Sequence, residues 1–409
     1  GAAASDGRSP LHAACQNGRV ECAEALVAAL LALPAPPAAA VVAAAAPAAA
    51  DGTGGDSDAS TVKDDDDAGS QGTREATDDE GGGIAPVVAT TARTAAAEID
   101  RATTAGETAL HLACAAGKKE CATLLLDARA SVDGSPTATC TPLYAACDRE
   151  WLGCVRALLA HSAGVNLSAK QKRTPLSVAC ERANTACVEL LINAHASVVH
   201  FAADGRSPLH HASVRGSAAI TSLLLRANCS VDGGGAANLP LHAACELGHA
   251  ACVELLLGAG ADKDACTPSG ASCVHLACAG GHARVAVQLL DAGAAIDLAG
   301  ADGITPLYAA CEAGHINCVL RLLERKANVG GPLYEASPGG YTPLHAACQH
   351  GHPIVAEELI TAKACIDAAG DEGETALHLA AESNNVLAMS VLLDAGARTN
   401  ARRATGEDA

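Results

Sequence analysis

The chain has 409 residues and a formal net charge of −19, and hydrophobic residues make up 49% of it. One Trp, one Phe and four Tyr are its only aromatic residues, which argues against the base-stacking platforms of proteins that bind single-stranded nucleic acids. The acidic balance argues against a surface that follows phosphates, so we expect no nucleic-acid partner. Aromatic side chains usually dominate a large core. This core must therefore rest on many small contacts between Ala, Leu, Val and Cys.

Cysteine usage and the apolar stretches bear on the compartment. The 19 Cys are an odd number in a long chain, unlike the disulfide framework of a small secreted protein. No charged start followed by an apolar run marks a signal peptide. The longest apolar stretch, residues 25–50, is mostly Ala and contains four Pro, which would break a membrane-spanning helix. We predict a reducing compartment, cytoplasmic or nuclear, and no membrane segment. Because the chain begins at Gly1 rather than Met, we expect an incomplete N-terminus.

The first pattern along the chain is the tetrapeptide Ser9-Pro10-Leu11-His12, and versions of it recur throughout. They start at residues 108, 141, 174, 207, 239, 272, 305, 342 and 375. From 108 onward, successive starts are 33, 33, 33, 32, 33, 33, 37 and 33 residues apart. A period of this length indicates stacked supersecondary units, so we predict ten repeats.

Each repeat reads as two helices and a loop. Ser or Thr supplies an N-cap oxygen, Pro suits the first helical position, Leu faces inward, and Ala-Ala-Cys keeps the first helix narrow. Nine residues after the Ser or Thr, a turn residue has to adopt the left-handed conformation of a helix C-cap. Asn384 tolerates this conformation, whereas at Glu150 and Ala183 we expect a local adjustment. In the other repeats the turn residue is Gly, at 18, 117, 216, 248, 281, 314 and 351. A second helix, such as 252–257, and a Gly/Ala/Asp-rich hairpin, such as 258–262, complete the unit.

The pattern is clearest at residues 302–311, where Asp-Gly-Ile-Thr-Pro-Leu-Tyr-Ala-Ala-Cys is followed by Gly314 and His315. This segment resembles the ankyrin-repeat motif nearly position by position. The resemblance implies an all-α solenoid of ten ankyrin repeats, each a helix–turn–helix with a β-hairpin loop. Stacking of neighbouring repeats would then build one continuous core. A solenoid is only two helices thick, which explains the shortage of aromatic side chains.

Domain boundaries follow from the places where the period breaks. We assign residues 1–33 to repeat 1 and residues 97–400 to repeats 2–10. Residues 34–96 between them are Ala/Pro-rich and then acidic, and residues 34–98 hold 12 acidic and 3 basic side chains, so −9 of the −19 lies there. Low hydrophobicity with concentrated charge predicts a long disordered insert.

Two further departures from the period lie toward the C-terminus. A smaller insertion occupies residues 330–340. Residues 401–409 copy the start of a repeat, since Gly406 falls 33 residues after Gly373. We therefore expect a truncated eleventh repeat and a chain that is a fragment.

Two sets of candidate ligands accompany the repeat. No Cys-x-x-Cys pair has the spacing of a zinc site, and free Cys packs as a small hydrophobe, so we predict that the repeated Cys are core residues. Only Cys140, at a hairpin tip, is a candidate for reactivity. The resemblance assigns the tetrapeptide His and the His after the turn Gly to hydrogen bonds between repeats. With no catalytic motif in the chain, we predict no catalytic residue, no metal and no cofactor. The eight Cys that share one position of the first helix are Cys15, Cys114, Cys147, Cys180, Cys245, Cys278, Cys311 and Cys348.

A binding surface is the remaining candidate site. In ankyrin proteins the partner usually lies along the hairpin tips and first helices. At these positions repeats 3–5 carry basic residues, whereas repeat 10 carries Asp371, Glu372, Glu374 and Glu382. Arg suits bidentate contact with carboxylates, so we predict a basic recognition stripe for an acidic peptide. A solvated helical surface is the alternative.

Trp151 occupies a slot that is His in four other repeats. It either anchors a partner or is partly buried against Leu152. The candidate protein-binding residues are Arg149, Trp151, Lys170, Lys172, Arg173, Arg182, Arg206 and Arg215.

The sequence thus predicts a non-catalytic scaffold that presents a concave ankyrin surface to other proteins. Its partners are expected to be acidic peptides, and Asp64–Asp67 of its own insert is one such segment within reach of the stripe. Two alternatives stay open: the substrate-receptor or adaptor arm of a ubiquitin ligase, and the regulatory region of a larger enzyme or channel. Sequence downstream of Ala409 would discriminate between them.

Overall fold

A computed structural model describes residues 6–32, 96–233, 239–330 and 338–403. The acidic segment Asp64–Asp67, almost all of the predicted disordered insert, Tyr334 in the smaller insertion and the tail from residue 404 lie outside the described residues.

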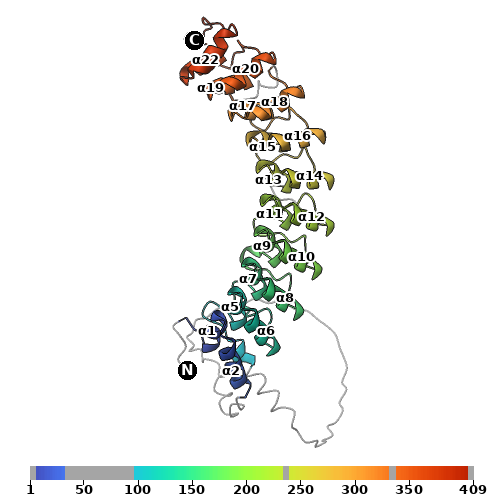
Figure 1. Cartoon of the computed structure of the whole chain (residues 1–409). Coiled ribbons are helices and arrows are strands. Elements are labelled where there is room, and N and C mark those ends of the chain that lie inside the picture. The colour runs from blue at the N-terminus through green and yellow to red at the C-terminus, as the bar shows by residue number, and fades with distance from the viewer. Residues whose placement is uncertain (1–5, 33–95, 234–238, 331–337, 404–409) are drawn as a thin grey trace, which may run out of the picture.

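The structure is an all-α solenoid of paired helices, as the sequence predicts. Each repeat contributes a first helix and a second helix, and Figure 1 shows that they form two rows along a bowed array, with the first helices on its concave side. The first helices are α1 (Pro10–Asn17), α5 (Ala109–Ala115), α7 (Pro142–Asp148), α9 (Pro175–Glu181), α11 (Pro208–Val214), α13 (Pro240–Glu246), α15 (Cys273–Ala279), α17 (Pro306–Glu312), α19 (Pro343–Gln349) and α21 (Ala376–Glu382).

The second helices form the convex row, and each packs against the first helix of its own repeat and the second helices beside it. They are α2 (Val20–Leu31), α6 (Lys119–Asp127), α8 (Leu152–Ala160), α10 (Thr185–Asn193), α12 (Ala218–Arg226), α14 (Ala250–Gly258), α16 (Ala283–Asp291), α18 (Ile316–Glu324), α20 (Pro353–Thr361) and α22 (Val386–Asp394). Two short 3₁₀ turns, η1 (Lys170–Lys172) and η3 (Pro338–Gly340), lie in the loops before α9 and α19.

The first helices begin where the Ser/Thr pattern predicts. Thr141 is a typical N-cap, because its side chain accepts a hydrogen bond from the Tyr144 backbone N–H at 3.2 Å. In other repeats the tetrapeptide His adds a second bond: the Thr342 N–H donates to Nδ1 of His345 at 3.1 Å. Leu239 has no oxygen to offer, and there His242 Nδ1 alone accepts the Leu239 N–H, at 3.3 Å. The start of each first helix is therefore paired even where the cap residue is atypical.

The turn between the two helices is left-handed in all ten repeats. The turn Gly residues have φ between 66° and 76°, and Asn384 has φ 55°. Our expectation of a local adjustment at Glu150 and Ala183 was wrong, because these residues adopt φ 64° and 58° like the others. A non-Gly residue pays about 1–2 kcal/mol for this conformation, which the packing of the flanking helices outweighs.

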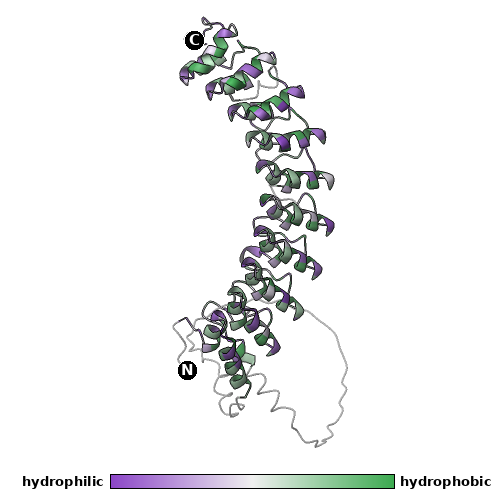
Figure 2. Cartoon of the chain, viewed as in Figure 1, coloured by the Kyte–Doolittle hydropathy of each residue, from purple (hydrophilic) through white to green (hydrophobic). Residues whose placement is uncertain are grey.

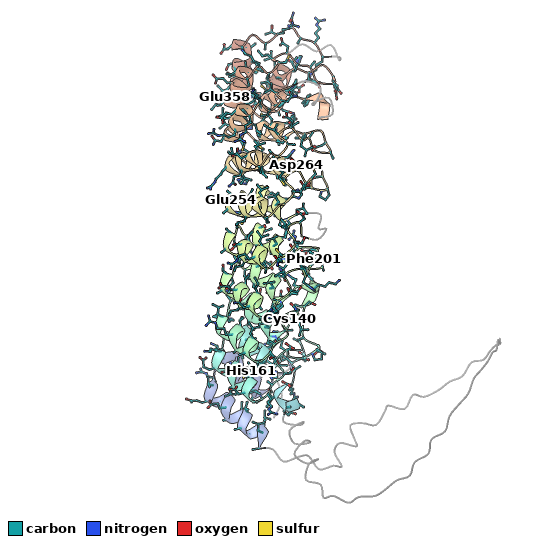
Figure 3. The ribbon with its side chains drawn as sticks, turned by 90° about the vertical axis from the view of Figure 1, so that its right-hand side faces the viewer. Cys140, His161, Phe201, Glu254, Asp264 and Glu358 are labelled. Carbon is teal, nitrogen blue, oxygen red and sulfur yellow. The ribbon has the colours of Figure 1, made fainter. Side chains whose placement is uncertain are left out.

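The loops between repeats are hairpins held by backbone hydrogen bonds. In most of the described loops, an N–H donates to the carbonyl four residues on, as from Ala202 to Arg206 at 3.1 Å and from Gly370 to Glu374 at 2.8 Å. Cys266 and Ser272 form an isolated antiparallel β-bridge in one of these loops. Figure 3 shows loop residues Cys140, Phe201 and Asp264 along one edge of the array, with Glu254 and Glu358 of second helices along the other.

Small side chains fill one long core that runs from Leu11 to Ala397, beside a small second cluster around Tyr308 and Ala346. Figure 2 shows hydrophobic residues along the helices and hydrophilic residues gathered at turns and helix ends. All eight Cys of the first-helix column are buried, as predicted. Leu, Ala and Cys therefore replace the aromatic side chains that a globular core of this size would use.

Repeat 1 stacks directly on repeat 2, although 63 undescribed residues separate them along the chain. The Thr104 N–H donates to the Asp6 carbonyl at 3.1 Å, and Nε2 of His12 donates to the Glu107 carbonyl at 3.2 Å. Asp100 Oδ1 accepts the Ser131 N–H at 2.7 Å. The same contact, 31 residues apart, recurs along the array at Asp133–Gly164, Asn166–Ser197, Asp264–Ala295, Asp297–Asn328 and Asp367–Arg398.

Candidate protein-binding surface

In six of the ten repeats, the residue after the turn joins neighbouring repeats. Nε2 of His249 donates to the carbonyl of Val214, the last residue of the preceding first helix, at 3.1 Å. Trp151 has the same role, since its Nε1–H donates to the Ala115 carbonyl at 3.2 Å. Its ring lies over Gly117, and 43% of the residue is exposed. We call these side chains the turn caps. The others that reach back in this way are His282, His315, His352 and Asn385.

A large turn cap demands Gly in the turn of the preceding repeat. A Cβ on Gly216 would lie 2.5 Å from Nδ1 of His249, and a Cβ on Gly117 would lie 2.4 Å from the Trp151 ring. Repeats 3 and 4 have non-Gly turn residues, Glu150 and Ala183. In each case the cap position of the next repeat holds a smaller side chain than His or Trp: Asn184 after Glu150, and Ser217 after Ala183. Asn184 and Ser217 bind backbone N–H groups of their own helices instead of reaching back.

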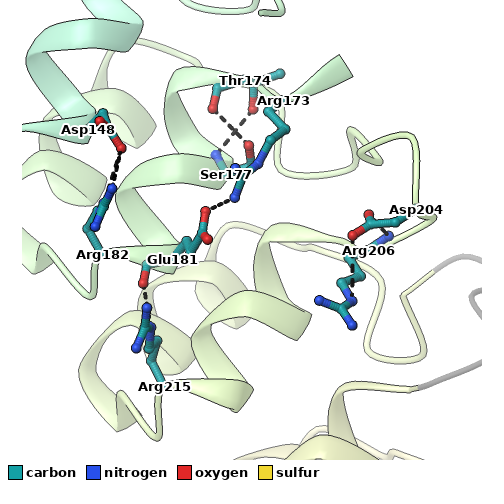
Figure 4. A network of polar contacts seen from close by, with 9 residues as sticks. All are labelled: Asp148, Arg173, Thr174, Ser177, Glu181, Arg182, Asp204, Arg206 and Arg215. Carbon is teal, nitrogen blue, oxygen red and sulfur yellow. Dashed lines mark hydrogen bonds and ion pairs between the residues drawn. The ribbon is translucent and has the colours of Figure 1, made fainter. Parts of the chain in front are cut away.

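Three of the predicted site residues form one column at the C-terminal ends of the first helices: Arg149, Arg182 and Arg215. Two of them reach into the preceding repeat. Arg182 donates from Nε and Nη2 to Asp148 Oδ1 at 3.1 and 2.8 Å, and Asp148 also lies 3.7 Å from Arg149. Figure 4 shows the contact between Arg182 and Asp148.

Arg215 makes the hydrogen bond that a turn cap makes in other repeats. In repeat 5 the cap position holds Ser217, and Nε of Arg215 donates to the Glu181 carbonyl at 2.6 Å. This acceptor is the last residue of the preceding first helix, as is Val214 for His249. Hydrogen bonding at Nε fixes the plane of the guanidinium group.

Arg173 and Arg206 form a second column, directly before the N-caps of α9 and α11. Arg173 is ion-paired with the carboxylate of Glu181. Arg206 lies 3.6 Å from Asp204, which also accepts the Arg206 N–H at 3.1 Å (Figure 4). The predicted stripe is therefore a mixed surface, in which Asp148, Glu181 and Asp204 alternate with the arginines.

The two remaining basic residues lie at the tip of the loop before α9. Lys170 begins η1, and Lys172 ends it with an exposed side chain. Gln171 and Lys172 have φ 64° and 57°, a strained conformation for successive non-Gly residues. The Gln171 carbonyl accepts the Ala203 N–H at 2.8 Å, so the tip is tied to the next loop.

Between the loops of repeats 4 and 5 the concave side contains an open cavity of about 690 Å³. It brings together Arg173, Arg206 and Arg215 of the stripe. Arg149, Trp151 and Arg182 are not among its lining residues. The cavity is also lined by Gln171, Glu181, Ala202, Ala203, Asp204, His211 and Val214.

His211 is the cavity residue that the sequence reasoning missed. It is 7% exposed, and its Nε2 is buried without a hydrogen-bond partner among the described residues. Burial lowers the pKa of His211 to about 4, and the positive charges of Arg173 and Arg206 act in the same direction, against Asp204. A signal existed in the sequence, since the same slot holds Ala, Leu or Val in the other repeats.

Cys140 does not have the environment of an activated thiol. Its Sγ lies 3.8 Å from Nε2 of His111, but burial raises the pKa of the Cys140 thiol, and Glu107 and Asp148 act in the same direction.

No group of three or more potential metal ligands converges anywhere in the described ranges. Within those ranges, none of the helices combines the length and apolar character that a membrane span requires.

Comparison with protein families agrees with this architecture. A model of three ankyrin repeats matches residues 88–171, 128–202, 152–234, 196–267, 241–332 and 330–403, and a single-repeat model matches residues 6–33. The chain therefore belongs to the ankyrin-repeat family. Such repeats are generally protein–protein interaction modules and typically non-catalytic. Among curated proteins, none matches the sequence.

Proposed function

We propose that this chain is a non-catalytic scaffold that binds a partner protein on the concave surface of repeats 3–5. The observation that supports it is that three arginines from two successive repeats, Arg173, Arg206 and Arg215, line one open cavity. Stacking holds these columns at a fixed spacing, so little ordering is needed when a partner binds.

The acidic residues in the stripe narrow the chemistry of the partner. A continuous acidic run, such as Asp64–Asp67, would bring its charges against Asp148, Glu181 and Asp204. Like charges brought together across an interface cost affinity. We therefore favour a partner segment with isolated acidic residues, each of which can meet an arginine.

Affinity capture with the whole chain tests this function. The variant Arg173→Glu/Arg182→Glu/Arg206→Glu should lose partners that the native chain retains, with the largest effect at low salt. A matched control makes the same charge change on the exposed face of the second helices: Arg156→Glu/Arg226→Glu/Arg284→Glu. If both variants retain the same partners, the stripe is not the contact region.

A further inference from the structure

We propose that the cavity between repeats 4 and 5 receives one acidic side chain, Asp or Glu, from an extended segment of the partner protein, and that Arg215 and His211 hold its carboxylate. This inference rests on the proposed function, because it assigns one contact within that binding surface.

The charges around the cavity leave room for a single carboxylate. Of the three lining arginines, Arg173 is paired with Glu181 and Arg206 lies beside Asp204. Arg215 donates to a backbone carbonyl, which carries no net charge. With His211 neutral, the lining therefore holds one unbalanced positive charge, on Arg215. A second carboxylate would meet Glu181 and Asp204.

Arg215 is already oriented for such a contact. Its Nε donates to the Glu181 carbonyl at 2.6 Å (Figure 4). No partner is found for its terminal NH₂ groups within the described residues. A guanidinium fork that is fixed on one side and free on the other matches the geometry of a carboxylate.

His211 supplies the second contact. Its Nε2 is a buried polar atom without a partner among the residues described, and His211 is one of the residues that line the cavity. A polar atom left unpaired inside a protein costs stability. A carboxylate in the cavity would accept a hydrogen bond from Nε2 and remove that cost. Ala145 and Ala243, in the same slot of the repeats on either side of repeats 4 and 5, have no such group.

The size of the cavity favours a peptide over a small ion. Its volume of about 690 Å³ lies within the range of roughly 300–1,000 Å³ that is typical of sites for drug-sized ligands. It is open on the concave side between two successive loops, so a chain can pass along the array while one side chain enters.

The test starts from a selection of random dodecapeptides displayed on phage, with the full chain as target. A synthetic, fluorescein-labelled copy of a selected peptide is then titrated by fluorescence anisotropy. Selected peptides should share one Asp or Glu without acidic neighbours. Changing this residue to Asn or Gln, or Arg215→Ala in the protein, should each weaken binding about tenfold to a hundredfold, as expected for a charged hydrogen-bonded contact.

Variants at position 211 separate the imidazole from simple packing. His211→Gln places an amide N–H near the position of Nε2 and should retain most of the affinity, whereas His211→Leu should weaken binding several-fold. Arg226→Ala, on α12 in the same repeat, is the control and should leave binding unchanged.

Because Arg215 also joins two repeats, its removal needs a structural control. In Arg215→Ala/Ser217→His/Ala183→Gly, a His cap over a turn Gly replaces the lost Arg215 bond. This variant should be folded and still bind weakly; full binding by it would overturn the inference.

The outcomes distinguish the two proposals. Peptides that bind tightly but tolerate Arg215→Ala and the loss of their acidic residue would refute the cavity contact and leave the scaffold function standing. Failure to select any peptide would count against both.

Discussion

Replacing Gly216 by Ala is expected to destabilise the array by about 2 kcal/mol, and half of this cost should depend on His249. Gly216 has φ 66°, a conformation that costs an Ala about 1 kcal/mol. The new Cβ would also lie 2.5 Å from Nδ1 of His249. Moving this ring breaks its bond to the Val214 carbonyl, worth about 1 kcal/mol.

The chain itself contains the compensated pair. Ala183 is a turn residue with φ 58°, and the cap position of the next repeat holds Ser217. The corresponding pair in other repeats is a turn Gly and a His cap. In a His249→Ser background, Gly216→Ala should therefore cost only about 1 kcal/mol, which gives a coupling energy of about 1 kcal/mol between the two positions. Native-state hydrogen exchange of α11, α12, α13 and α14 measures each free energy locally, which suits an array whose repeats unfold in parts.

Gly260→Ala is the matched control. Gly260 has φ 88°, and no atom lies within 4 Å of the point that a Cβ would occupy there, so this change should show only the backbone cost of about 1 kcal/mol. If Gly216→Ala costs the same in the native chain and in the His249→Ser background, within about 0.3 kcal/mol, the cap does not impose the turn Gly.

Three further predictions concern single positions. Ala183→Gly should stabilise repeat 4 by about 1 kcal/mol, the reverse of the backbone cost expected for Gly260→Ala; urea unfolding measures this. Trp151→His should change stability by less than about 0.5 kcal/mol, and Trp151→Ala should cost about 1–2 kcal/mol, because only His can renew the bond to the Ala115 carbonyl. The pKa of His211, lowered to about 4 by burial, means that the unfolded chain binds the extra proton between pH 6.5 and 4. Stability should thus fall by up to about 3 kcal/mol over this range, and a His211→Leu chain should lack this part of the decline.

The sequence predicted the features that repeat along the chain. Ser/Thr caps, inward Leu, buried Cys and left-handed turns each depend on a residue's place within its own repeat, which the period reveals. The partners of the arginines were not predicted, because they come from other positions: Arg173 meets Glu181 eight residues on, and Arg182 meets Asp148 in the preceding repeat. Such pairing depends on side-chain reach across the stack and has no signature within a single repeat.

Departures from the consensus occur in sets that span neighbouring repeats, and this links stacking to binding. Loss of the His cap at Ser217 removes the need for Gly at 183 and leaves the Glu181 carbonyl to Arg215. The guanidinium group that replaces the cap then faces an open cavity beside His211, itself a departure from an otherwise apolar slot. In a repeat with the standard Gly–His arrangement, the imidazole ring satisfies that carbonyl and no arginine is held there. The concave surface of repeats 4 and 5 is therefore distinctive because its stacking contacts differ, so changes to either will alter both.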